Sequence, residues 1–133
     1  MATATILDNE YATLFFHQES KIVHHRVKKF IHGERLRELL TKGCETLKKN
    51  LGTKWLSDDT NNGPLSKDDE AWAKTSWFPS VVKAGWKSWA LVLPAALIAQ
   101  MNMKKFTDDY AKAGITVQVF SDPKQAMAWL ESK

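Results

Sequence analysis

The chain has 133 residues, 44% of them hydrophobic, which is enough to close one core and too few for two, so we expect a single domain over residues 1–133. The net charge of +4 is a modest excess, and the longest apolar run, residues 89–99, is interrupted by Pro94, which excludes a membrane span. A single cysteine, Cys44, cannot form an internal disulfide, and the N-terminal region lacks the apolar segment of a secretion signal. Both features favour a cytoplasmic protein.

Two stretches near the N-terminus, residues 11–17 and 22–31, are rich in β-branched and aromatic side chains and predict the strands of a β-hairpin. Basic side chains gather from Lys21 to Arg37, over the second strand and the start of the next element. Such a run is usually a solvated face, so we expect no nucleic acid as a partner. Steep salt dependence of binding to a duplex or a single strand would be the sign of one.

Apolar residues recur at steps of three and four between Leu36 and Leu51, which predicts an amphipathic helix that Gly52 ends. Residues 54–59 then predict a short strand, and residues 60–64 are a loop of turn-forming residues.

Ser66 is placed to cap a second helix, whose first turn is acidic. Pro79 lacks an amide hydrogen and crowds the preceding turn, so we expect this helix to kink or restart near Phe78. The remaining elements alternate between strand and helix, at residues 86–93, 95–113, 115–120 and from Asp122 onward. The order ββαβαβαβα predicts an α/β fold with a mixed, mainly parallel five-stranded sheet and about four helices.

Asp58 and Asp59 are the strongest candidates for catalysis or Mg²⁺ binding, because ligands of open α/β sheets gather beyond the carboxyl ends of the strands. Neighbouring residues of an extended chain point to opposite sides, however, and capping of the loop is the more common role of such aspartates. The four histidines lack the spacing of metal ligands, and the sequence contains no glycine-rich phosphate loop and no serine nucleophile elbow. We therefore expect no catalysis, no metal and no cofactor.

Six tryptophans are many for this length, and most of them are expected to lie in the core. Trp72 and Trp77 are separated by five residues, which is about 140° around an α-helix, so they cannot both sit centrally on one buried stripe. We expect one of the two to be exposed and available as an interface anchor.

Four segments carry a resemblance that extends over nearly the whole chain: residues 54–58, Trp72 with residues 77–79, residues 84–87 and residues 90–94. As a set they resemble the small bacterial SpoIIAA-like proteins, STAS-like proteins related to anti-sigma-factor antagonists and to the lipid-binding lobe of Sec14-type proteins. The resemblance implies a non-enzymatic domain that docks on a protein partner or, less often, holds a small ligand. The Asp-Ser-Ser/Ala-Gly motif with its phosphorylatable serine is missing, so a kinase-switched cycle is not implied.

The predicted function is a non-enzymatic binding or regulatory domain that resembles anti-sigma-factor antagonist modules and docks on a protein partner. A turn-rich loop, an acidic helix start and an available tryptophan converge in one stretch, whose expected partner-binding residues are Asp58, Asp59, Asn61, Asn62, Ser66, Trp72 and Trp77. Replacing Asp58 or Asp59 by alanine is then expected to weaken the interaction with little change in melting temperature. The alternatives are a carrier of a small apolar molecule or lipid, and a small enzyme with a pocket beyond residues 54–59. Self-association into a homodimer is also open.

Overall fold

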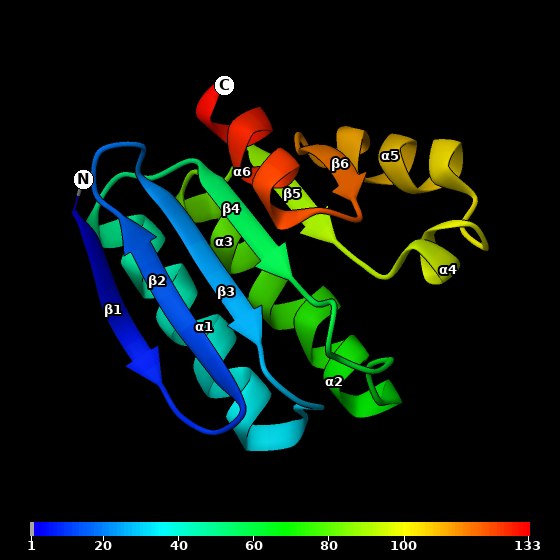
Figure 1. Ribbon diagram of the computed structural model, residues 1–133, viewed down its shortest axis with the longest axis horizontal. Helices are drawn as coiled ribbons and strands as arrows, with labels where there is room; N and C mark the ends of the chain where they lie inside the picture. The colour runs from blue at the N-terminus through cyan, green and yellow to red at the C-terminus, as the bar shows by residue number, and fades with distance from the viewer. Residues whose placement is uncertain (1) are drawn as a thin grey trace.

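Six strands form one mixed sheet in the computed structural model, which describes residues 2–133 (Figure 1). Their order across the sheet is their order along the chain: β1 (Thr3–Asp8), β2 (Ala12–His17), β3 (Ile22–Val27), β4 (Lys54–Asp58), β5 (Ser88–Val92) and β6 (Thr116–Phe120). The first three strands are antiparallel to one another, and β3 to β6 are parallel. The predicted α/β class with a mixed, mainly parallel sheet is confirmed, with six strands in place of five.

The additional strand is β1, which the sequence did not predict. It lies at the edge of the sheet and pairs only with β2, so most of its side chains are exposed and no clear alternation of apolar residues marks it. The pairing with β2 also shifts register between Thr5 and Leu7, which breaks the period further.

One face of the sheet carries the three connections between the parallel strands (Figure 1). Helix α1 (Gly33–Lys49) packs against β2 and β3, the continuous segment α2 (Lys67–Trp72), η1 (Ala73–Trp77) and α3 (Phe78–Ala84) lies beside it, and α5 (Met103–Lys112) contacts β6. The larger core lies beneath these helices and includes the fully buried side chains of Leu39, Trp55 and Val81.

The opposite face is covered by α6 (Pro123–Glu131), which contacts β4, β5 and β6. A smaller core lies under this helix, with Leu56, Val92 and Leu130 among its buried members. The last helix begins where the sequence predicts it, because the side chain of Asp122 caps it by accepting a hydrogen bond from the backbone N–H of Lys124.

Two predicted helices are interrupted. The restart expected near Phe78 is present, because a π-helical turn, η1, ends there and Pro79 lies in the first turn of α3. The single helix predicted over residues 95–113 is wrong, since the chain forms a short α4 (Ala95–Ile98) and then α5. Asn102 starts α5 by accepting a hydrogen bond from the backbone of Lys105 at 3.1 Å, and the helix-favouring residues on both sides conceal this cap in the sequence.

The apolar run of residues 89–99 is divided between β5 and α4. Across residues 2–133, no helix combines the length and the apolar character that crossing a membrane requires.

Candidate functional site

The two candidate aspartates at the end of β4, Asp58 within the strand and Asp59 directly after it, serve different faces of the sheet. Asp58 is 7% exposed, and its Oδ1 accepts hydrogen bonds from the hydroxyl and the backbone N–H of Thr60, at 2.7 and 3.3 Å. Asp59 lies on the α1 side, where its Oδ1 is 2.9 Å from Nε2 of His25. The structure therefore does not bring the two carboxylates together, and Asp58 closes the turn that ends the strand.

Asp59 belongs to a hydrogen-bonded chain that we call the histidine bridge: Trp55, His25 and Asp59. The indole Nε1 of Trp55 donates to Nδ1 of the buried His25 at 3.1 Å. Because an indole nitrogen can only donate, Nδ1 of His25 carries no proton, and the proton on Nε2 is donated to Asp59. Both ring nitrogens are thus engaged, which leaves no lone pair for general-base chemistry, and the bridge fastens β3 to β4 and to the loop that follows.

The polar residues of the following loop and helix start also bond within the chain. Asn62 Oδ1 accepts from the backbone N–H of Ile31 at 3.1 Å, whereas Asn61 is exposed. Ser66 caps α2 as predicted, since its hydroxyl accepts from the backbone N–H of Asp69 at 3.2 Å. The buried carboxylate of Asp69 accepts in turn from the backbone N–H of Gly33, which lowers the pKa of this group.

The prediction that one of Trp72 and Trp77 is exposed is wrong, because both are half-buried and pack against the larger core. The 140° separation holds for an α-helix, but η1 turns with hydrogen bonds from residue i to i+5, so residues five apart lie on nearly the same side. The indole of Trp77 donates to the backbone oxygen of Leu40 at 2.7 Å and meets the ring of Trp55 edge-on. Trp72 lies under the guanidinium of Arg37.

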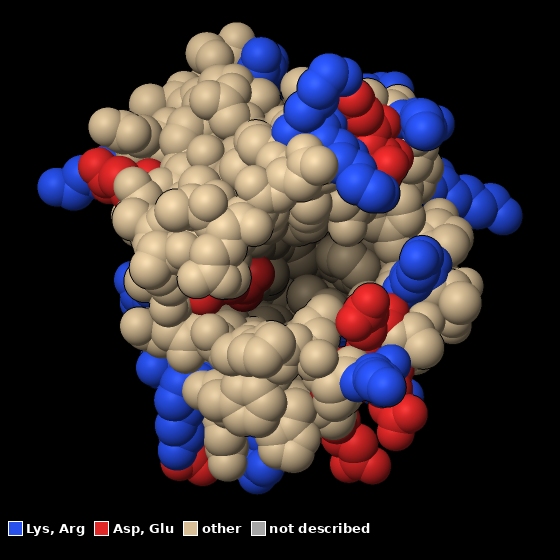
Figure 2. Space-filling model, turned by 90° about the vertical axis from the view of Figure 1, so that its right-hand side faces the viewer, with Lys and Arg blue, Asp and Glu red and all other residues tan. Residues whose placement is uncertain are grey.

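A cavity of about 530 Å³ lies between two helical walls, one formed by η1 and the start of α3 and the other by α5. The side chains of Trp86 and Trp89 line it from the sheet side. We call this cavity the aromatic pocket, after its aromatic lining: Trp77, Phe78, Trp86, Trp89, Phe106 and Tyr110. Glu70, Lys74 and Asp109 also line it. Figure 2 shows this side of the molecule hollowed, with uncharged residues deep in the hollow and both acidic and basic side chains at its edge.

The rings of the aromatic pocket support one another. Phe78, Trp86, Trp89 and Tyr110 form a closed circuit in which neighbouring ring centroids are 5.0 to 5.5 Å apart, at angles typical of edge-to-face packing. The indole N–H of Trp86 donates to the backbone oxygen of Ser88, and that of Trp89 to the hydroxyl of Ser57. The lining thus presents hydrocarbon and π-surface to the cavity. Of these aromatic residues, sequence reasoning named only Trp77 as a site residue, because the lining comes from three separate segments of the chain.

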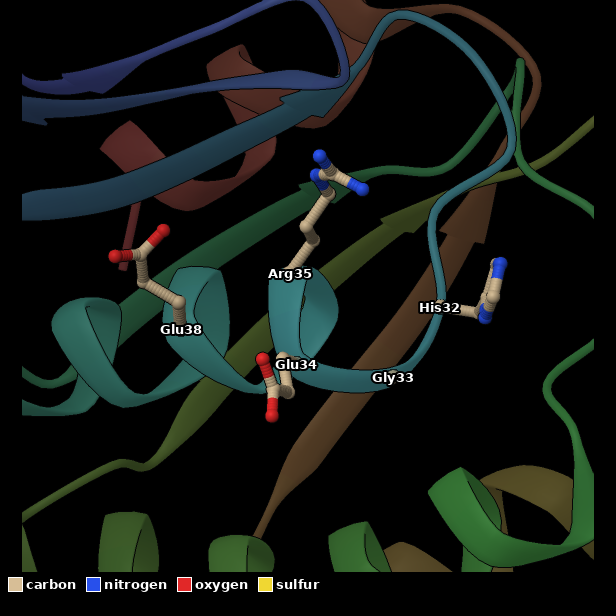
Figure 3. Close-up of a pocket in the computed structure, with 5 residues that line it drawn as sticks. All are labelled: His32, Gly33, Glu34, Arg35 and Glu38. Carbon is tan, nitrogen blue, oxygen red and sulfur yellow. The ribbon is translucent and has the colours of Figure 1, made fainter.

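A second depression, of about 600 Å³, lies at the start of α1 and is lined by residues of that segment alone: His32, Gly33, Glu34, Arg35 and Glu38. In Figure 3 the side chains of His32, Glu34 and Arg35 point in different directions. The guanidinium of Arg35 lies over the ring of Tyr11, 4.4 Å from its centroid. This depression is an open surface without convergent groups, and the aromatic pocket is the better candidate site.

The basic run of residues 21–37 is partly neutralised by its own chain. Lys28 pairs with Asp8 at 2.8 Å and Lys29 with Glu10 at 2.9 Å, and the guanidinium of Arg26 lies over the ring of Phe15. These contacts distribute the cations along the β1–β2–β3 edge.

The other side chains that could act in catalysis or bind a metal, His17, His24 and Cys44, do not form a site. His17 Nε2 and His24 Nδ1 are 3.0 Å apart, and burial lowers the pKa of His24 to about 3. Cys44 is half-buried, and burial raises the pKa of its thiol, which disfavours the nucleophilic thiolate. In the part of the chain that the structure describes, no three His, Cys, Asp or Glu side chains are grouped so as to hold a metal ion.

Neither a protein-family model nor a curated protein matches the sequence. Among solved structures, the chain is similar to an uncharacterised protein of the DUF3478 family with a SpoIIAA-like fold from Shewanella loihica, with a TM-score of 0.55 and 17% sequence identity. The match covers 97% of this chain and 92% of that protein. This similarity confirms, at the level of the fold, the resemblance that residues 54–94 suggested: the chain has a SpoIIAA-like, STAS-type fold.

Proposed function

We propose that this protein is a non-catalytic binding domain that holds a small, largely apolar molecule in the aromatic pocket. The observation that carries the proposal is a cavity of about 530 Å³ lined by six aromatic side chains. Pockets for small molecules typically measure about 300 to 1,000 Å³ and combine an apolar lining with a few polar groups. By contrast, the polar atoms of the histidine bridge and of Asp58 form hydrogen bonds within the chain.

The backbone around the pocket supports the same conclusion. The π-helical turn η1 places Ala73, Lys74 and Trp77 on the cavity wall, and π-helical turns are found frequently at functional sites. The pocket also lies between two of the crossovers that connect parallel strands, which bring α3 and α5 side by side through the contact of Phe78 with Tyr110.

Binding of the neutral, fluorescent probe Nile red tests this proposal. Ala113, which follows the last residue of α5, lines the pocket, whereas Ala111 on α5 lies outside it; both positions are exposed. We expect Ala113→Phe to fill part of the cavity and to weaken Nile red binding at least fivefold, while Ala111→Phe binds like the parent. Equal binding by both variants, or no binding by the parent chain, would refute the proposal. Native mass spectrometry of the purified protein would then identify the molecule it retains from the cell.

Docking on a protein partner stands as a second proposal, because apolar side chains are exposed beside the predicted loop. Phe30 is 47% exposed, stacks on His32 and lies over Gly63, and Leu65 is 40% exposed. Leu65 also lines the aromatic pocket, so ligand binding there can alter this surface. In affinity purification, Phe30→Ser should lose a partner that Ile6→Ser, at a similarly exposed position on β1, retains. Retention by both variants would contradict this docking surface.

A further inference from the structure

The hydrogen-bond donors of the aromatic pocket are almost all used inside the protein. The indole N–H groups of Trp77, Trp86 and Trp89 donate to Leu40, Ser88 and Ser57 at 2.7, 3.0 and 2.9 Å. An anionic group in the cavity would need such donors. Among the side chains that line the pocket, only Lys74 and the hydroxyl of Tyr110 are left to offer a proton to a ligand.

Groups that attract positive charge outnumber these donors. Six aromatic rings, whose π-faces carry negative potential, line the cavity together with the carboxylates of Glu70 and Asp109. Figure 2 shows acidic and basic side chains side by side at the edge of the hollow, and among the charged residues that line the cavity the two carboxylates face a single ammonium, that of Lys74. The phenol of Tyr110 responds to this environment, since burial raises its pKa and the charges of Asp109 and Glu70 raise it further.

We propose that the molecule bound in the aromatic pocket is a small organic cation that carries an alkylated ammonium group. An alkylated ammonium has a diffuse charge and an apolar surface, so it can leave water for aromatic rings at little cost and is attracted by their faces. This inference rests on the proposed function, because it names the chemical class of the ligand held in that pocket.

Lys74 is the natural competitor of such a cation. It lies on η1 at the pocket, and the pKa of Asp109 is lowered mainly by its ion pair with Lys105, at 2.8 Å, and additionally by Lys74. The ammonium of Lys74 thus neutralises part of the negative potential of Asp109 that would attract a cationic ligand. Removing this charge should strengthen the binding of a cation, whereas removing Glu70 should weaken it.

Choline and 3,3-dimethylbutan-1-ol test the inference, because they have the same shape and differ only in the charged nitrogen. In an NMR titration that follows the indole signals of Trp86 and Trp89, we expect choline to bind about five- to tenfold more tightly than the alcohol. Glu70→Gln should lower choline affinity about threefold and Lys74→Gln should raise it by a similar factor, with no change for the alcohol. Glu45→Gln, the same charge change at an exposed position of α1, is the control.

Each outcome separates this inference from the proposed function. Equal binding of choline and the alcohol in the pocket would overturn the inference that the ligand is a cation, and a neutral apolar ligand would remain. Tighter choline binding that is unaffected by Glu70→Gln and Lys74→Gln would place the cation elsewhere and also overturn the inference. If neither probe shifts the two indole signals while Nile red binds, the inference of a cationic ligand is refuted and the proposed binding of an apolar molecule in the pocket stands. If Nile red fails as well, both proposals are wrong.

Discussion

The histidine bridge and the aromatic pocket lie on the same side of the sheet and use similar residues in opposite ways. In the bridge, every polar atom of the His25 ring and the indole of Trp55 has a partner from the chain itself. In the pocket, the indoles are also satisfied, but ring surfaces, two carboxylates and an ammonium remain around an open cavity. The residue types that suggest chemistry in a sequence therefore matter less than whether the fold leaves them unoccupied.

The two regions are physically joined. The ring of Trp55 contacts Trp77 and Trp86, at centroid distances of 5.3 and 5.9 Å, so the bridge supports the aromatic side chains of the pocket from beneath. If this division between a rigid support and an open site is correct, substitutions in the support should cost stability, and substitutions in the pocket should change binding.

The largest effect is expected where α1 approaches Trp55. A Cβ atom at Gly43 would overlap the Cη2 and Cζ2 atoms of the buried Trp55 ring. We expect Gly43→Ala to reduce the free energy of unfolding by about 3 kcal/mol, as overpacked cores do. Helix propensity alone predicts the opposite sign, a gain of about 1 kcal/mol. Denaturant unfolding decides between them, with Glu45→Ala at an exposed position of the same helix as control; a stabilised Gly43→Ala variant would contradict the close packing of this support.

The pair of His17 and His24 is expected to have the second-largest effect, because only one of the two ring nitrogens of His24 has a hydrogen-bond partner and the other is buried without one. His24 Nδ1 meets His17 Nε2, but burial lowers the pKa of His24 from 6.5 to about 3. The unfolded chain therefore binds more protons than the folded one between pH 6.5 and 3, so stability falls as the pH drops through that window. From His24 alone we expect the protein to be about 2 kcal/mol less stable at pH 5 than at pH 7.

His24→Phe isolates this contribution, because the variant lacks the titrating ring and keeps an aromatic side chain beside Phe15. Its stability, measured by denaturant unfolding at both pH values, should fall by less than half as much as that of the parent. An equal fall in the two proteins would place the acid sensitivity elsewhere, for example in His17, whose pKa burial also lowers.

Features that depend on neighbouring residues were predictable from the sequence. The cap at Ser66, the restart at Phe78 and the divergence of Asp58 and Asp59 all follow from local backbone chemistry, and the structure has them. The α/β order followed from the period of the apolar residues and the turn residues between them. The edge strand β1 carried too weak a pattern, because only one of its sides is paired.

The candidate site was not predictable in the same way. Its aromatic residues belong to η1, α3, α5 and the region of β5, and only the crossovers bring these segments together. The π-helical turn that redirects Trp77 has no sequence signal that separates it from an α-helix, so the angular argument about Trp72 and Trp77 started from the wrong pitch. Conversely, Asp59 looked available because its partner, His25, lies more than thirty residues earlier in the chain.

The smallest effect, and the one that separates support from site most directly, is expected at Asp59. Asp59→Ala would leave Nε2–H of the buried His25 without an acceptor, which costs about 1 to 2 kcal/mol. Asp59→Asn keeps a carbonyl oxygen in the same place and should lose less than half of that amount. Because Asp59 does not line the aromatic pocket, both variants should bind Nile red within about twofold of the parent at temperatures where they are folded. Unchanged stability of Asp59→Ala would mean that this carboxylate is free for a partner, as the sequence suggested. A loss of stability that Asp59→Asn largely restores, with the pocket unaffected, would assign Asp59 to the support.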